Sequence, residues 1–121
     1  MARSRIADDA GEAAVREALA DGASRDTIAT AVRYLLQLLA ERAVGNTVEV
    51  RVPPFGAVQA IEGPRHTRGT PPNVIETDAS TWLALATGRD DWATAIAEGR
   101  VQASGSRADL TGYLPILRMG Q

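Results

Sequence analysis

The segment from residue 74 to 117 alternates short apolar runs with single glycines. Glycines at this spacing restrict the segment to short helices and strands. A strand pattern at 74–77 is followed by Asp78, a residue type that caps helix N-termini. Two short apolar runs then end at Gly88 and Gly99, as helices often do, and Asp90 or Asp91 opens the second of them. The segment therefore predicts a strand followed by two short helices.

A second strand and a last helix are predicted beyond Gly99. Residues 101–103 form a short strand pattern. After it, Leu110, Leu114 and Leu117 recur at helical spacing, which predicts a last helix that kinks or ends at Pro115.

The part before residue 74 divides at Gly45. Residues 8–44 have helical periodicity and predict two helices, the first opened by Asp8 or Asp9 and running to about residue 21, and the second capped by Ser24. The period then changes to strict alternation at 47–52. After a Pro-Pro turn, residues 57–61 predict a second strand antiparallel to the first.

These patterns predict one α+β domain over residues 1–121, with a helical part at 8–44 and strands and helices at 46–117. We expect a curved, mixed or antiparallel sheet of four to five strands covered by helices. Only 4% of the residues are aromatic, so the core is expected to be aliphatic, which makes an internal cavity plausible.

Three segments resemble the sterol carrier protein 2-like family, in particular its small single-domain proteins from actinobacteria. They are the run 48–59 (VEVRVPPFGAVQ), the loop 63–73 (GPRHTRGTPPN) and the glycine-punctuated segment 78–114. The resemblance implies an apolar tunnel or cavity between sheet and helices. It also implies non-catalytic binding or carriage of a lipid-like ligand, either fatty acyl or sterol-like.

Apolar residues on the predicted strands and helices are candidates for lining such a cavity. They are Val48, Val50, Val52, Phe55, Val58, Trp82, Leu85, Trp92, Ile96, Leu110 and Leu114. The alternative is that the same residues form an ordinary closed core, since alternating apolar faces normally pack shut. Both tryptophans would then anchor their helices to the sheet.

Arg65, His66 and Arg68 form the one chemically suggestive polar cluster, in a loop bounded by Gly and Pro. Two guanidinium groups and an imidazole could hold a carboxylate or phosphate head group. The alternative is that they are solvated or hydrogen-bonded to backbone. Glu76 and Asp78 could likewise act as an acid–base pair, or simply serve as an arginine partner and a helix cap.

Composition argues against several other classes. The chain has no cysteine and one histidine, so we expect no disulfide, no metal site and no cofactor. Its net charge of -2 argues against nucleic-acid binding. No apolar run reaches the ~20 residues of a membrane span, so we expect no stable membrane insertion and a cytoplasmic location.

Two functions other than lipid carriage stay open at this point. The chain could be a ligand-free interaction module, either a homodimer or a docking partner of another protein. It could also be an enzyme that uses His66 with Glu76, although no catalytic motif accompanies them. We therefore expect a non-enzymatic protein.

Overall fold

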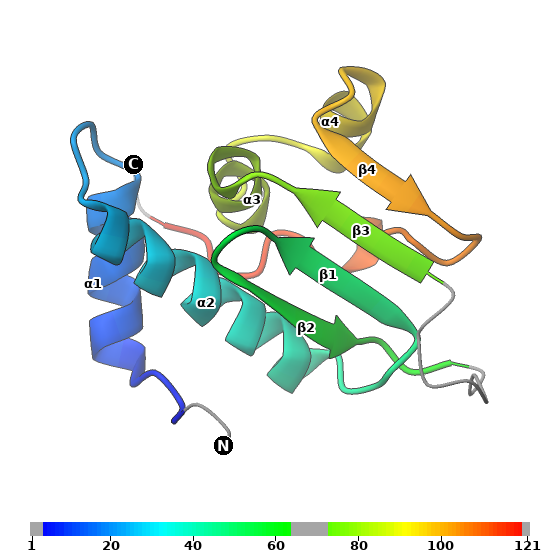
Figure 1. Cartoon of the computed structure of the whole chain (residues 1–121), viewed down its shortest axis with the longest axis horizontal. Coiled ribbons are helices and arrows are strands. Elements are labelled where there is room, and N and C mark those ends of the chain that lie inside the picture. The colour runs from blue at the N-terminus through cyan, green and yellow to red at the C-terminus, as the bar shows by residue number, and fades with distance from the viewer. Residues whose placement is uncertain (1–3, 64–72, 120–121) are drawn as a thin grey trace.

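The computed structural model describes residues 4–63 and 73–119. In chain order, the described elements are α1 (Asp8–Ala18), α2 (Arg25–Arg42), β1 (Val48–Val52), β2 (Gly56–Ala60), β3 (Asn73–Thr77), α3 (Ala79–Ala86), α4 (Trp92–Ala97), β4 (Val101–Ser104) and the 3-10 turn η1 (Thr111–Tyr113). Figure 1 shows one sheet with the long α2 running alongside its edge strand β2. The predicted α+β class is confirmed.

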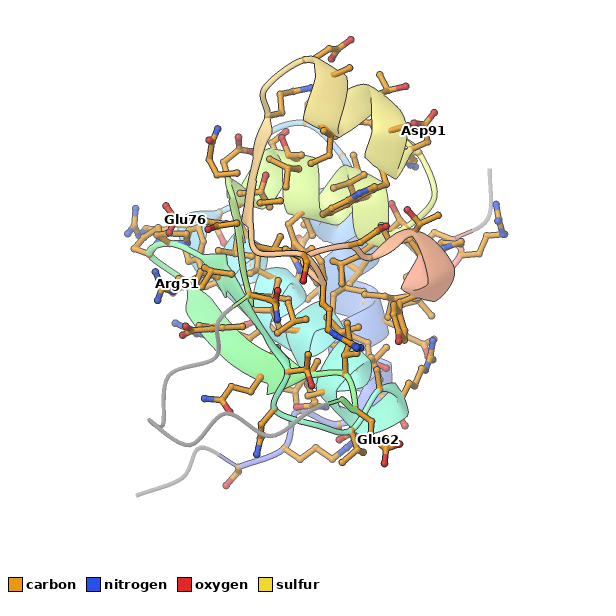
Figure 2. All side chains as sticks on the ribbon, turned by 90° about the vertical axis from the view of Figure 1, so that its right-hand side faces the viewer. Arg51, Glu62, Glu76 and Asp91 are labelled. Carbon is orange, nitrogen blue, oxygen red and sulfur yellow. The ribbon has the colours of Figure 1, made fainter. Side chains whose placement is uncertain are left out.

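The four strands form one mixed sheet in the order β2-β1-β3-β4. β1 is antiparallel to β2, as predicted, and parallel to β3, while β3 and β4 are antiparallel. Val48, Val50 and Val52 are fully buried on the face of β1 that the helices cover. The opposite face carries Arg51 and Glu76, which lie on the uncovered side of the sheet in Figure 2.

Helix α2 is buried around most of its circumference because three elements pack on different sides of it. The ring of Tyr34 lies against Gly11 of α1, and the side chain of Leu36 lies against Gly56 of β2. On a third side, the carbonyl oxygen of Val32 accepts a hydrogen bond from the indole of Trp82 in α3. The main core is therefore organised around this one helix.

Three helices begin where the sequence predicts a side-chain cap. Ser24, Asp78 and Asp91 each accept a hydrogen bond from the backbone N–H three residues later. α1 is different: Ala7 occupies its N-cap position, with no side-chain cap. Asp8 instead accepts hydrogen bonds from Tyr34 and Arg5, so its carboxylate is committed to tertiary contacts. α1 also ends at Ala18, earlier than predicted.

The predicted last helix is wrong. Only the single 3-10 turn Thr111–Tyr113 forms, with the Asp109 carboxylate accepting hydrogen bonds from Thr111. Leu114 is extended, with φ -105° and ψ 146°, because a residue that precedes proline is driven out of the helical region. The chain then crosses the end of α3, where the N–H groups of Ile116 and Leu117 donate to the carbonyl oxygen of Ala86.

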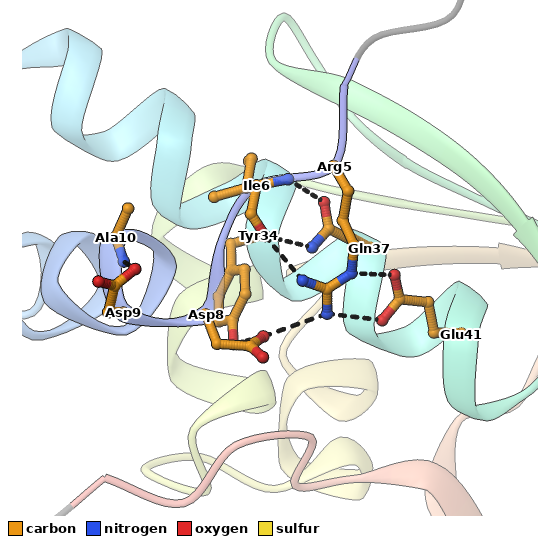
Figure 3. Close-up of polar contacts among 8 residues, drawn as sticks. All are labelled: Arg5, Ile6, Asp8, Asp9, Ala10, Tyr34, Gln37 and Glu41. Atoms are coloured by element: carbon orange, nitrogen blue, oxygen red, sulfur yellow. Dashed lines mark hydrogen bonds and ion pairs between the residues drawn. The ribbon is translucent and has the colours of Figure 1, made fainter.

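The N-terminal segment is held against α2 by a polar cluster (Figure 3). The side-chain amide of Gln37 pairs with the backbone N–H and C=O of Ile6, at 2.8 and 2.9 Å. The guanidinium of Arg5 makes two hydrogen bonds to Glu41 and one to Asp8. Together with the Tyr34–Asp8 bond of 2.8 Å, these contacts determine where α1 starts.

We predict that Gly11→Ala destabilises the protein. A Cβ at this buried position would lie 2.2 Å from a ring atom of Tyr34, which itself is only 1% exposed. Overpacking of this kind costs ~1–3 kcal/mol, while the gain in helix propensity is only ~1 kcal/mol. Urea denaturation should therefore show a net loss of free energy of unfolding.

Gly112→Ala is the matched control, because a Cβ there meets no atom within 4 Å. We expect its free energy of unfolding to change by less than ~0.5 kcal/mol. If Gly11→Ala proves as stable as this control, the close approach of α1 to Tyr34 is wrong.

We also predict that Tyr34→Phe weakens the protein at neutral pH and much less in acid. The pKa of Asp8 is held below its usual value, first by the hydrogen bond from Tyr34 and then by that from Arg5. A depressed carboxyl pKa contributes stability above the unfolded-state pKa, and this contribution is lost as the pH falls through the folded-state pKa. The difference in Tm between wild type and Tyr34→Phe should therefore be largest near pH 7 and shrink toward about pH 2. A difference independent of pH would mean that the phenol acts only through packing.

Candidate functional site

Six of the apolar residues predicted to line a cavity lie in the packed core, each at most 1% exposed. One is Leu85, and the other five are Val48, Val50, Val52, Trp82 and Leu110. The Trp82 indole is also satisfied as a hydrogen-bond donor, at 3.3 Å from the carbonyl oxygen of Val32. None of the five lines any of the three open grooves that are described next.

The largest of these grooves, of about 730 Å³, we call the corner groove. It lies where the α1–α2 turn, the start of α2, the β1–β2 turn and α3 come together. These segments meet at one end of the sheet in Figure 1. Its apolar floor is formed by Leu19, Ile28, Phe55, Leu83 and Ala84.

Charged side chains stand on the rim of the corner groove. They are Asp21, Arg25 and Arg89, and all three are exposed. The guanidinium of Arg25 lies over the ring of Phe55, 5.3 Å from its centroid, in a cation–π contact. Within the described residues, neither arginine forms an ion pair with a carboxylate. Both guanidinium groups can therefore meet an anion from solvent.

A smaller groove of about 410 Å³, the edge groove, runs beside the edge strand β2. It contains two predicted residues, Phe55 and Val58, together with Ile6 and Leu36. Arg33 also lines it, but its Nε donates to the carbonyl oxygen of Phe55 at 2.8 Å. Phe55 thus separates the edge groove from the corner groove and has atoms in both.

The third groove, also about 410 Å³, lies between α3, α4 and the C-terminal segment. It contains the predicted residues Leu85, Trp92 and Leu114. Its carboxylates already have partners: Asp90 pairs with Arg100, and Asp91 caps α4. Hydrogen bonds from Thr94, the backbone N–H first and then the hydroxyl, hold the pKa of Asp91 below its usual value.

The remaining predicted residues lie elsewhere. Ile96 is 39% exposed on α4 and lines none of the three grooves. The cluster Arg65, His66 and Arg68 lies outside the described residues. The predicted residues are therefore not brought together at one place within the described part of the chain.

Glu76 and Asp78 take the structural roles that were the alternative to acid–base chemistry. Glu76 lies 4.0 Å from Arg51 across the open face of the sheet. Asp78 accepts a hydrogen bond from the N–H of Thr81 at 2.7 Å and caps α3. In residues 4–63 and 73–119, no group of three or more His, Cys, Asp or Glu side chains is placed to hold a metal ion. None of the helices there is long and apolar enough to cross a bilayer.

Sequence reasoning missed most of the corner groove. Its residues come from four separate segments, and the helical spacing around Ile28 and Leu83 predicts only faces packed on the core. One signal was available. Arg25 occupies the first position of α2, where the helix dipole favours an acidic side chain, and a cation there suggests another role.

The chain matches no curated protein, but it does match a family profile. The family profile described as bacterial SCP ortholog matches residues 24–116, from the cap of α2 to the segment that crosses α3. The match contains the whole sheet and leaves α1 outside it. The chain therefore belongs to the bacterial SCP ortholog family.

Proposed function

We propose that this protein binds and carries an apolar, lipid-like molecule and performs no covalent chemistry on it. The observation that carries the proposal is the corner groove, an open concavity of about 730 Å³ with an apolar floor, in a member of a sterol-carrier-related family. Small-molecule sites in proteins usually enclose ~300–1,000 Å³ and are mostly apolar, and the corner groove falls within that range.

The burial of the groove floor supports the same proposal. Leu19, Ile28 and Phe55 are only partly buried although they pack against the main core. Apolar surface left in this state is stabilised when a ligand covers it. The gain is ~0.8 kcal/mol for each ligand methylene that is removed from water. Burial of the ligand's alkyl chain would therefore favour binding even without a polar contact.

An alternative is the ligand-free interaction or dimerisation module, and one observation favours it. β2 is an edge strand, and its sequence, GAVQA, contains no charged residue and no proline. Exposed edges without such residues can pair with a strand of another chain. The edge groove beside β2 would then receive side chains of the partner.

Native mass spectrometry of the protein as purified from its host, followed by denaturing extraction, tests the proposal. We expect a stoichiometric apolar adduct on a monomer. A dimer without adduct would favour the module instead. If the delipidated protein also takes up no acyl or sterol probe in a saturable way, carriage is wrong.

We predict that Ser80→Trp blocks the binding of such a probe. Ser80 is exposed on α3 and lines the corner groove, so an indole at this position fills the groove without disturbing the core. Ala13→Trp is the matched control, because Ala13 is exposed on α1 and lines none of the three grooves. Equal probe affinity for the two variants would place the ligand elsewhere in the molecule.

A further inference from the structure

We propose that the ligand of the corner groove is a single-chain amphiphile with a carboxylate head, which Arg25 and Arg89 bind at the rim. This inference rests on the proposed function and specifies its ligand class. It follows from the charged side chains on the rim of the groove, from the elements that position them and from their net charge.

Arg25 is held at the boundary between the apolar floor and solvent. Its guanidinium lies over the face of Phe55, at 5.3 Å from the ring centroid. Phe55 is itself partly buried and packs against the core, so one side of the cation faces apolar surface. An ion pair formed there is less screened than one formed in open solvent, which strengthens the attraction for an anion.

Arg89 comes from a different element and lines the same groove. It follows Gly88 at the end of α3, where Gly88 has a φ of 82° that favours glycine. The backbone N–H of Arg89 donates to the carbonyl oxygen of Ala84 at 2.9 Å, and Ala84 is part of the groove floor. The turn thus places the backbone of Arg89 directly beside the apolar floor of the corner groove.

The charge balance of the rim selects among anions. Two arginines and Asp21 are the charged residues that line the groove, which leaves one net positive charge. A carboxylate compensates this charge, whereas a phosphate monoester carries ≈ -1.5 to -2 near neutral pH and would leave an excess next to Asp21. A guanidinium also matches the planar carboxylate with two parallel hydrogen bonds.

The test compares ligands that share one alkyl chain and differ in the head group. Tetradecanoic acid, tetradecanol and tetradecyl phosphate are each titrated against delipidated protein that carries the neutral fluorescent probe N-phenylnaphthylamine, and displacement of the probe is measured. We expect the acid to bind more tightly than the alcohol and the phosphate. We also expect added salt to weaken binding of the acid and not of the alcohol, because salt screens the ion pairs.

Substitutions on the rim should then shift affinity in opposite directions. The double variant Arg25→Gln/Arg89→Gln should lose roughly 10-fold in affinity for the acid and nothing for the alcohol, as expected for two exposed ion pairs. Asp21→Asn should bind the acid a few-fold more tightly, because a repulsive charge is removed. Arg16→Gln changes the net charge by the same amount per residue away from the grooves and should have no effect.

Each outcome decides one of the two proposals. If acid and alcohol bind equally well and the rim variants change neither, the head-group assignment is wrong while lipid binding stands. If the phosphate binds best, the carboxylate assignment is likewise overturned. If no alkyl ligand displaces the probe and the protein retains its fold by circular dichroism, both this inference and the proposed function are wrong.

Discussion

The rest of the structure depends on the burial of α2 between three partners. One helix can contact a second helix, a sheet and a third helix only if its apolar residues surround most of the axis, and α2 meets this requirement from Ala29 to Leu39. Each partner approaches closely. Gly11 admits the ring of Tyr34, Gly56 admits Leu36, and the Trp82 indole reaches the backbone at Val32. The helices cover one face of the sheet, and the other face carries polar side chains.

This arrangement also explains where the open grooves lie. The centre of the helix–sheet interface is filled by valines, leucines and Trp82, all of which are nearly inaccessible. Concavities form at the ends of the interface, where helices stop and turns begin. The corner groove is the largest of the three that are described, and its floor continues the core outward. A ligand there would extend the core, and it would not need to displace side chains from it.

The polar contacts divide into those that build the fold and those that are available to a ligand. Arg5, Asp8, Tyr34 and Glu41 satisfy one another and hold α1 in place. Arg51, Glu49 and Glu76 do the same on the open face of the sheet. Arg25 and Arg89 differ, because within the described residues their guanidinium groups have an aromatic ring or solvent beside them instead of a carboxylate. This difference is why we propose that a charged ligand is recognised at the corner groove.

Local sequence determined much of the fold. Alternation identified the buried face of β1, and the caps Ser24, Asp78 and Asp91 marked three helix starts, because both signals depend on neighbouring residues alone. The last helix failed because Pro115 forces Leu114 to be extended, although the leucine spacing is helical. Asp8 failed as a cap because Tyr34 and Arg5 compete for its carboxylate. Only the tertiary structure decided which apolar residues are sealed and which stay open. That outcome depends on how α1, α2, α3 and the β1–β2 turn meet, and no spacing within one segment specifies it.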